Sequence, residues 1–319
     1  MKFATIGHLD HKERLKQIPP DWIKNDLIIS PKIDFQKTEG YFLALKLTAE
    51  QMTNLPLEKV RQKILDAALY SQNKLDVELL QLGAFNTSVT SGGTWLTKQT
   101  QYKGFVNHGD SYTATITCQN IMEVLKKKQI ESQKTKIAIV GAYGIIGEAT
   151  SKILVPKFSE AILIGRRQGK LKDLEGKISG NFTTTTNLEE TKKADVILTA
   201  TNHPTALLKT DHLKEKAIVV DVSQPPNLSL SLCNTRQDVT RVDGGYVDIP
   251  EKYQIQIPGM PKGKLFACIV EVIMQAMENE KQNHVGTIDL NHLQKTEMWA
   301  EKYNFKLKEL TNFGKPITI

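Results

Sequence analysis

The sequence predicts an α/β protein: a Rossmann-like doubly wound parallel sheet, joined to an N-terminal α/β substrate domain and to C-terminal helices. Three observations predict this fold. A glycine-rich stretch at residues 136–147 opens with an apolar run that is typical of a buried strand. Further apolar, β-branched runs follow it and alternate with helical patterns. The chain has 319 residues, which is long for one domain and suits two.

The glycine-rich stretch has the strand–turn–helix context of a dinucleotide-binding loop. Its strand spans residues 137–140, and a helix is predicted from about residue 148 to 157. Gly141 permits a tight turn, Gly144 lets the backbone approach a pyrophosphate, and Gly147 lets the helix pack closely on the strand. The spacing is G-x-x-G-x-x-G, so an ordinary turn without a ligand is the alternative. The expected cofactor-binding residues of this loop are Gly141, Ala142, Tyr143, Gly144, Ile145, Ile146 and Gly147.

The end of the next strand points to the type of cofactor. This strand covers residues 161–164 and is followed by Gly165, Arg166 and Arg167. NAD-binding folds carry an acidic residue at this place to hold the ribose 2′-hydroxyl. Two guanidinium groups would instead bind a 2′-phosphate. We therefore expect NADPH, and a solvated basic turn is the alternative.

Two later strands are predicted at residues 194–201 and 217–222. The first ends in small residues against which a nicotinamide ribose can lie, so Thr201 and Val222 are expected at the cofactor. Asn187 and the pair Thr210–Asp211 suit helix N-caps between the strands. In a doubly wound sheet, ligands bind at the carboxyl ends of the strands.

Composition excludes several classes of protein. Three cysteines without a C-x-x-C pair argue against a disulfide scaffold or a zinc site, and favour a reducing cytoplasm. The seven histidines form no ligand-spaced pair, so no metal is expected. No apolar run reaches the length of a membrane span, and the N-terminus turns polar too early for a signal peptide. The net charge of +7 suits an acidic partner, but no nucleic-acid-binding motif is evident.

The domain organisation follows from these elements. Residues 1–130 form the expected N-terminal acyl- or substrate-binding domain, with an early strand, an extended piece near residues 41–47 and a helix near 57–71. A small hydroxyl-rich loop at 82–93 and a helix at 112–127 complete it. Residues 131–263 form the NADP(H)-binding domain. Residues 264–319 form a C-terminal segment, with helices at 264–281 and 290–303, that packs back on the first domain.

Cys268 is predicted in the first turn of the helix that opens at Lys264. It falls at the edge of an apolar stripe, beside a polar side that carries Glu271 and Gln275. The helix N-terminus, with Lys262 and Lys264 nearby, would favour the thiolate. A thiolate beside NADPH suggests a covalent thioester that hydride reduces to an aldehyde. From spacing alone, a small buried hydrophobe is the commoner role of a lone cysteine.

These residues resemble the cyanobacterial-type long-chain fatty acyl-[acyl carrier protein] reductases, which form aldehydes. The resemblance spans nearly the whole chain. It is carried by I-G-H-L at 6–9, L-G-A-F at 82–85, G-D-S-Y-T-A at 109–114, the glycine loop at 141–147, G-G at 244–245 and L-F-A-C at 265–268. The last match is the most specific, because the family's acyl-accepting cysteine occupies it.

The resemblance implies that Cys268 is the nucleophile and that NADPH reduces its acyl-enzyme. It implies acyl carrier protein or acyl-CoA as the donor of the acyl group. Hydroxyls of Ser88, Ser111 or Tyr112 are the candidates to stabilise the oxyanion. The family's G-N-T-H-T-A stretch has its histidine at the position of Tyr112 and its asparagine at that of Asp110. His108 lies close in the sequence and is a candidate substitute for that histidine, but we interpret it as a surface-loop residue.

Several other functions fit parts of the sequence. One is a reductase of a non-fatty carrier-bound acyl or aminoacyl thioester. Residues 221–227, D-V-S-Q-P-P-N, are similar to a stretch of glutamyl-tRNA reductase, which also reduces a cysteine-bound thioester. A free-substrate NADP-dependent dehydrogenase would not need Cys268. A catalytically silent NADP(H)-binding sensor or scaffold would bind the cofactor without turnover.

Overall fold

The computed structural model describes residues 1–253, 255 and 257–319. They form two compact units, and each contains a sheet of its own. Unit 1 comprises Met1–Tyr112 and Val247–Lys306, and unit 2 comprises Thr113–Tyr246 and Leu307–Ile319. The division therefore lies near residue 112, within a helix. From the sequence, we expected it after residue 130. The C-terminal segment predicted at 264–319 is likewise shared between the two units.

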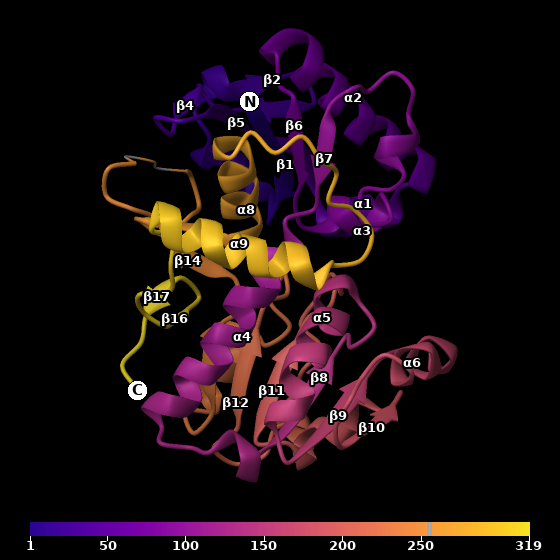
Figure 1. The fold of residues 1–319 in the computed structure, drawn as a ribbon, viewed down its shortest axis with the longest axis vertical. Coiled ribbons are helices and arrows are strands. Elements are labelled where there is room, and N and C mark those ends of the chain that lie inside the picture. Colours follow the sequence, from indigo (N-terminus) through magenta and orange to yellow (C-terminus); the bar gives the residue numbers. More distant parts are fainter. Residues whose placement is uncertain (254, 256) are drawn as a thin grey trace. The chain divides into compact units, whose positions relative to one another are not determined.

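Unit 1 is built on a seven-stranded sheet (Figure 1). Four parallel strands follow the order β5, β1, β6, β7, and three short antiparallel strands extend the sheet beside β5. The strands are β1 (Phe3–Leu9), β2 (Ile23–Lys24), β3 (Leu27–Ile29), β4 (Ile33–Asp34), β5 (Glu39–Thr48), β6 (Leu79–Leu82) and β7 (Phe105–Asn107).

The longest helix of unit 1, α2 (Leu57–Leu75), packs against β1 and β5. It buries Val60, Ile64 and Ala68, which recur at helical spacing and so form one apolar face. A second helix, α8 (Ala267–Met277), contacts β1 and β6. The other helical elements of this unit are η1 (Lys12–Gln17), η2 (Pro20–Trp22), α1 (Ala49–Asn54), α3 (Phe85–Val89), η3 (Leu96–Lys98) and α9 (Leu290–Tyr303).

Unit 2 contains a six-stranded, all-parallel sheet in the order β10, β9, β8, β11, β12, β13. Numbered from the first strand of the unit, this order is 3-2-1-4-5-6, the arrangement of a Rossmann fold. The fold class predicted from the sequence is therefore confirmed. The strands are β8 (Lys136–Val140), β9 (Glu160–Ile164), β10 (Phe182–Thr185), β11 (Val196–Thr199), β12 (Ile218–Asp221) and β13 (Thr240–Asp243).

Alternate residues of these strands enter two cores, one on each face of the sheet. Ile137, Leu198 and Val220 face a cluster that includes residues of α4 (Asp110–Lys127) and α5 (Ile145–Leu154). Ala138 and Val219 face the other cluster. Both faces are thus buried, as the nearly continuous apolar strands predict. The remaining helical elements are η4 (Ser132–Lys134), η5 (Val155–Lys157), α6 (Gln168–Glu175), η6 (Leu188–Lys193), η7 (Thr210–His212) and α7 (Leu230–Thr235).

Two further pairs of strands are short: β14 (Tyr246–Asp248) with β15 (Lys264–Phe266), and β16 (Thr311–Asn312) with β17 (Lys315–Pro316). The pair β14–β15 corrects the sequence prediction, because residues 264–266 are extended and α8 begins only at residue 267. Similarly, α5 begins at residue 145, three residues before the predicted start. In contrast, α9 spans the predicted residues 290–303. No helix within the described residues is both long and apolar enough to cross a membrane.

Candidate functional site

The glycine loop of unit 2 joins β8 to α5 with the backbone geometry that the sequence predicts. Gly141 has a φ of +88°, a left-handed conformation that favours glycine. A Cβ on Gly147 would collide with the carbonyl oxygen of Gly141, so this glycine allows close packing of helix and strand. Gly144 is the N-cap of α5 and has no side chain of its own to cap the helix. The N-terminus of α5 can therefore hold an anionic group.

The end of β9 lies beside this loop. A Cβ on Gly165 would meet the ring of Tyr143, so that ring packs directly over the end of the strand. Arg166 and Arg167 follow and are both exposed. Neither guanidinium forms a hydrogen bond or ion pair with another residue in the part of the chain that the structure describes. Both are thus available to an anionic ligand.

A buried polar network holds the segments after β11 and β12. Thr201 donates from its hydroxyl to Asn227 Oδ1 (2.6 Å) and from its backbone N–H to Ser223 Oγ (3.1 Å). Asp221 accepts hydrogen bonds from the backbone N–H groups of Asn227 (2.9 Å) and Leu228 (3.1 Å). Val222 follows it and donates its N–H to the Thr199 carbonyl (3.1 Å). The predicted Thr201 and Val222 thus lie together at the carboxyl end of the sheet.

Arg241 of β13 completes this network. Its guanidinium contacts Asp221 (3.2 Å) and Asp243 (2.7 Å), and all three side chains are buried. Burial disfavours the charge of Arg241, but the two carboxylates outweigh it and raise the pKa. Asp243 also accepts from Thr311 Oγ1 (2.8 Å) and from the N–H of Gly314 (2.8 Å), so it fastens the C-terminal hairpin. Residues 217–222 were predicted as a strand with Val222 at the cofactor, and residues 221–227 were also noted as a family likeness. Arg241 was not among the predicted site residues.

Cys268 lies in the first turn of α8 in unit 1 and is partly exposed. The structure confirms its place on the helix but corrects its expected ionisation. Burial, with the negative charges of Asp110 and Glu271, raises the pKa of the Cys268 thiol to about 12. The thiol is therefore protonated at neutral pH. Lys264, expected to favour the thiolate, is instead paired with Asp248 (2.6 Å).

The segment between β7 and α4 packs directly on Cys268. Gly109 has a φ of +74°, and a Cβ there would lie 2.6 Å from the Cα and Cβ atoms of Cys268. Only glycine therefore lets the two backbones approach so closely. Asp110 follows and begins α4, and its pKa is raised well above its usual range by burial and by the charge of Glu271.

His108, interpreted from the sequence as a surface-loop residue, is in fact 1% exposed. Its Nδ1 accepts a hydrogen bond from the Asp110 N–H (2.9 Å), which orients the imidazole and leaves the proton on Nε2. Burial lowers the pKa of His108 to about 4, so the ring is neutral at physiological pH. This burial could not be inferred from local sequence, because residues that contact His108 lie far along the chain.

The three hydroxyl groups proposed for the oxyanion have different surroundings. Ser111 is buried in the first turn of α4, between Asp110 and Tyr112. Tyr112 is also buried, but its hydroxyl donates to the carbonyl of Phe305 (3.0 Å), so it is not free to donate to an acyl oxygen. Ser88 lies on α3, which is not one of the two segments that meet at Cys268.

The polar side of α8 is buried rather than exposed. Glu271 accepts from the N–H of Tyr112 (2.8 Å), and Gln275 Oε1 accepts from Asn107 Nδ2 (2.7 Å). Both side chains are fully buried. Burial opposes the charge of Glu271, but its hydrogen bonds with His292 and with the Tyr112 N–H help to hold its pKa below the usual range. These hydrogen bonds hold the segment 107–112 against α8 and so position it at Cys268.

Comparisons with known proteins agree with this architecture. The sequence model of the shikimate/quinate 5-dehydrogenase family matches residues 123–244, within unit 2 and less than half of the chain. Together with the strand order, this match identifies a Rossmann-type NAD(P)-binding fold. It supports an NAD(P)-dependent oxidoreductase and does not distinguish NADPH from NADH.

Two curated relatives align over most of this chain. Aminotransferase PigE of Serratia sp. is 22% identical over 321 residues, which cover 93% of this chain but 36% of PigE. Long-chain acyl-[acyl-carrier-protein] reductase of Synechococcus elongatus is 22% identical over 315 residues, covering 88% of this chain and 90% of that protein. Among solved structures, L-tryptophan dehydrogenase from Nostoc punctiforme is 12% identical and has a TM-score of 0.43, covering 95% of this chain and 80% of that one.

Proposed function

We propose that this chain uses NADPH to reduce a carrier-bound acyl thioester, acyl-[acyl carrier protein] or acyl-CoA, to an aldehyde through an acyl-enzyme at Cys268. The observation that carries the proposal is the backbone contact between Gly109 and Cys268. It joins the G-D-S-Y-T-A and L-F-A-C segments, which resemble two motifs of the acyl-[acyl carrier protein] reductases. A distant relative with that activity, aligned over most of both chains, supports the same reading.

The first half of the reaction is an exchange of thioesters. The Cys268 sulfur attacks the acyl carbonyl carbon and forms a new carbon–sulfur bond, and the bond to the carrier sulfur breaks. The proton of Cys268 ends on the carrier thiolate, which leaves as a thiol. When bound, NADPH would supply the hydride that replaces the Cys268 sulfur on the acyl carbon and gives the aldehyde. The cysteine would leave as a thiolate and take up one proton from solvent, which restores the thiol. Formation of the acyl-enzyme without NADPH, measured by intact mass, tests this step directly.

A thiol with a pKa near 12 needs a general base in order to attack. We propose Asp110 for this role. Its charge acts on the Cys268 thiol, and its own raised pKa makes it a better proton acceptor than an ordinary carboxylate. It can pass the proton to the departing carrier sulfur. Ser111, in the same helical turn, remains the candidate oxyanion donor. Tyr112 has no role as an oxyanion donor in this proposal, because its hydroxyl already donates to the Phe305 carbonyl.

Asp110→Asn is expected to slow acylation of Cys268 by about 10²–10⁴-fold at neutral pH. In the unmodified protein, acylation should speed up as pH rises through the raised pKa of Asp110 and then level off, because the base must be ionised. In the variant only the thiolate attacks, so the rate should rise about tenfold per pH unit towards the pKa of the thiol. Single-turnover acylation, measured by intact mass across pH, distinguishes the two profiles.

The exposed Asp76 provides the control for this variant, since Asp76→Asn removes the same charge on the same unit. It should leave the acylation profile unchanged. Faster acylation in Asp110→Asn at neutral pH would contradict the role of base. That result would mean that the charge of Asp110 only suppresses ionisation of the thiol.

The cofactor part of the proposal rests on the glycine loop and on the two arginines after β9. In it, residues 141–147 hold the pyrophosphate, Thr201 and Val222 line the nicotinamide ribose, and Arg166 and Arg167 bind the 2′-phosphate. The features that fit such a ligand are the left-handed Gly141 and the two guanidinium groups, which have no partner among the residues that the structure describes.

Replacing Arg166 and Arg167 together by alanine is expected to weaken NADPH binding by about 10–100-fold, because charge-assisted hydrogen bonds to the phosphate are lost. NADH binding should change by less than about threefold. Titration of both cofactors by fluorescence measures the two losses. The control removes two other exposed charges, Lys170 and Lys172 of α6. The 2′-phosphate role would be refuted if the arginine variant lost affinity for NADPH and NADH equally, or if the lysine variant weakened NADPH binding as much as the arginine variant does. The two arginines would then belong to a solvated basic turn.

A further inference from the structure

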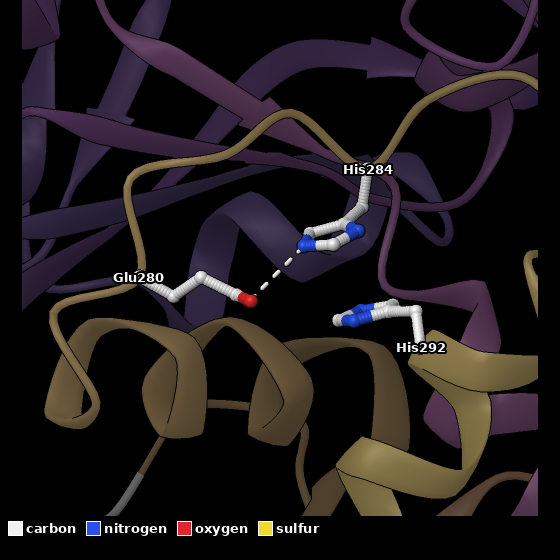
Figure 2. A group of neighbouring side chains, drawn as sticks. All are labelled: Glu280, His284 and His292. Atoms are coloured by element: carbon white, nitrogen blue, oxygen red, sulfur yellow. Dashed lines mark hydrogen bonds and ion pairs between the residues drawn. The ribbon is translucent and has the colours of Figure 1, made fainter.

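We propose that Glu280, His284 and His292 form a binding site for a divalent transition-metal ion of the zinc class. The three side chains come together in unit 1 (Figure 2). Each offers one ligand atom, and these atoms all lie within 4.8 Å of one another. The proposed reduction uses none of the three, so this inference is independent of that function.

The backbone around His284 is fixed by hydrogen bonds to strand β7 and its surroundings. Its N–H donates to the Val106 carbonyl (2.9 Å), and its carbonyl accepts from the N–H of His108 (3.1 Å). Glu280 precedes it in the segment between α8 and α9, and His292 lies in the first turn of α9. The three residues would therefore join α9 and the segment before it through one ion.

His292 has a free ring nitrogen that is directed by a buried carboxylate. Its Nε2 is 3.0 Å from Glu271 Oε1. Because the ionised Glu271 only accepts, we assign the imidazole proton to Nε2, which leaves the lone pair on Nδ1. That Nδ1 is buried and has no hydrogen-bond partner among residues 1–253, 255 and 257–319. A carboxylate on one nitrogen of a histidine whose other nitrogen binds metal is the usual outer shell of zinc sites.

Glu280 and His284 already face each other. Glu280 Oε2 and His284 Nε2 are 3.1 Å apart (Figure 2), a separation that two ligands with bonds of about 2.0–2.1 Å to one ion can adopt. The second oxygen of Glu280 pairs with Lys295, which is half exposed. The carboxylate would therefore bind an ion through one oxygen.

Charge and ring geometry set two conditions for binding. Glu271 and Glu280 carry two negative charges, and Lys295 carries one positive charge beside them. The carboxylates thus outnumber the ammonium group, which favours a cation. The two rings are nearly parallel, 9° apart with centroids at 3.4 Å. Because each lone pair lies in its ring plane, one ion reaches both nitrogens only if the rings turn out of this stack.

The ligand set selects the class of ion. Two imidazoles and one carboxylate suit zinc and its transition-metal neighbours, whereas calcium and magnesium prefer oxygen ligands alone. Three protein ligands leave a fourth position of a tetrahedral ion for water. Residue spacing does not indicate this site, because His292 is eight residues from His284 and approaches it only in the folded chain.

The test uses the full chain without a purification tag, treated with a chelator and titrated calorimetrically with Zn²⁺ and, separately, with Mg²⁺. We expect one saturable Zn²⁺ site and no comparable Mg²⁺ binding. His292→Ala should weaken Zn²⁺ binding by at least about 10-fold. Lys295→Met should tighten it, because an opposing charge is removed. Binding of Co²⁺ to the unmodified protein, with the visible absorption of a tetrahedral ion, provides a measurement that needs no variant.

The matched control is His11→Ala. His11 is exposed and also lies beside two carboxylates, at 3.5 Å from Asp10 and 3.5 Å from Glu13. This variant should bind Zn²⁺ as the unmodified chain does. The proposal is overturned if the unmodified chain binds no Zn²⁺, or if binding is lost in His11→Ala and kept in His292→Ala. A Co²⁺ spectrum typical of an octahedral, water-rich site would also contradict it.

Discussion

Cys268→Ser is expected to abolish the acyl adduct and to lower aldehyde formation by 10³-fold or more, an order of magnitude taken from losses of other catalytic nucleophiles. A serine hydroxyl at this position is far less nucleophilic than a thiol with a base beside it. The measurement has two parts: intact mass after incubation with acyl-[acyl carrier protein] or acyl-CoA without NADPH, and aldehyde formation after NADPH is added.

The control for this variant is Cys233→Ser. Cys233 lies in α7 of unit 2 and is also partly exposed, so the substitution tests whether any accessible thiol is acylated. It should keep both the adduct and the turnover. Full turnover by Cys268→Ser would exclude the thioester mechanism and favour a free-substrate dehydrogenase. NADPH binding without an adduct or turnover in the unmodified chain would favour a silent cofactor-binding protein.

Arg241→Met is expected to lower the free energy of unfolding by about 3–5 kcal/mol. The substitution leaves the buried carboxylates of Asp221 and Asp243 without their cation, and methionine supplies no hydrogen-bond donor. It also removes the guanidinium that stacks on the Phe313 ring, with the Arg241 Cζ atom 4.0 Å from the ring centroid. Chemical denaturation, monitored by a spectroscopic signal that reports on unit 2, measures the change in the free energy of unfolding.

Arg167→Met provides the comparison, because it removes an exposed guanidinium of the same unit without an ion-pair partner among the described residues. Its effect on the free energy of unfolding should stay within about 0.5 kcal/mol. A loss below about 1 kcal/mol in Arg241→Met would show that the two aspartates accept protons or find water when the arginine is removed.

Local features of the sequence predicted the nucleotide-binding unit well. The apolar run at 137–140, the three glycines and the later apolar strands all appear where they were expected. These features depend on short stretches of backbone: a strand, a turn with positive φ and a helix start. The predicted starts of α5 and α8 were wrong. α5 begins directly after its N-cap Gly144, and α8 begins only after β15, which pairs with β14.

The surroundings of Cys268 show what a local pattern misses. From the sequence, we predicted the cysteine in the first helical turn. We expected the helix N-terminus and two nearby lysines to favour its thiolate. In the structure Asp110 and Glu271 lie near it and Lys264 is paired elsewhere. The same applies to His108, which is buried, and to Glu271, which belongs to a fully buried hydrogen-bonded side of α8.

The sequence by itself determined the fold class and the glycine loop, since hydrophobic periodicity and glycine spacing report on neighbours within a few residues. Cys268 became the candidate nucleophile through the resemblance of residues 265–268 to a family motif. Only the tertiary structure decided which charges surround Cys268, which arginine neutralises Asp221 and which histidines meet beside Glu280. The physical reason is that burial and Coulomb interactions depend on distance in space, and these partners are separated by up to about 160 residues along the chain.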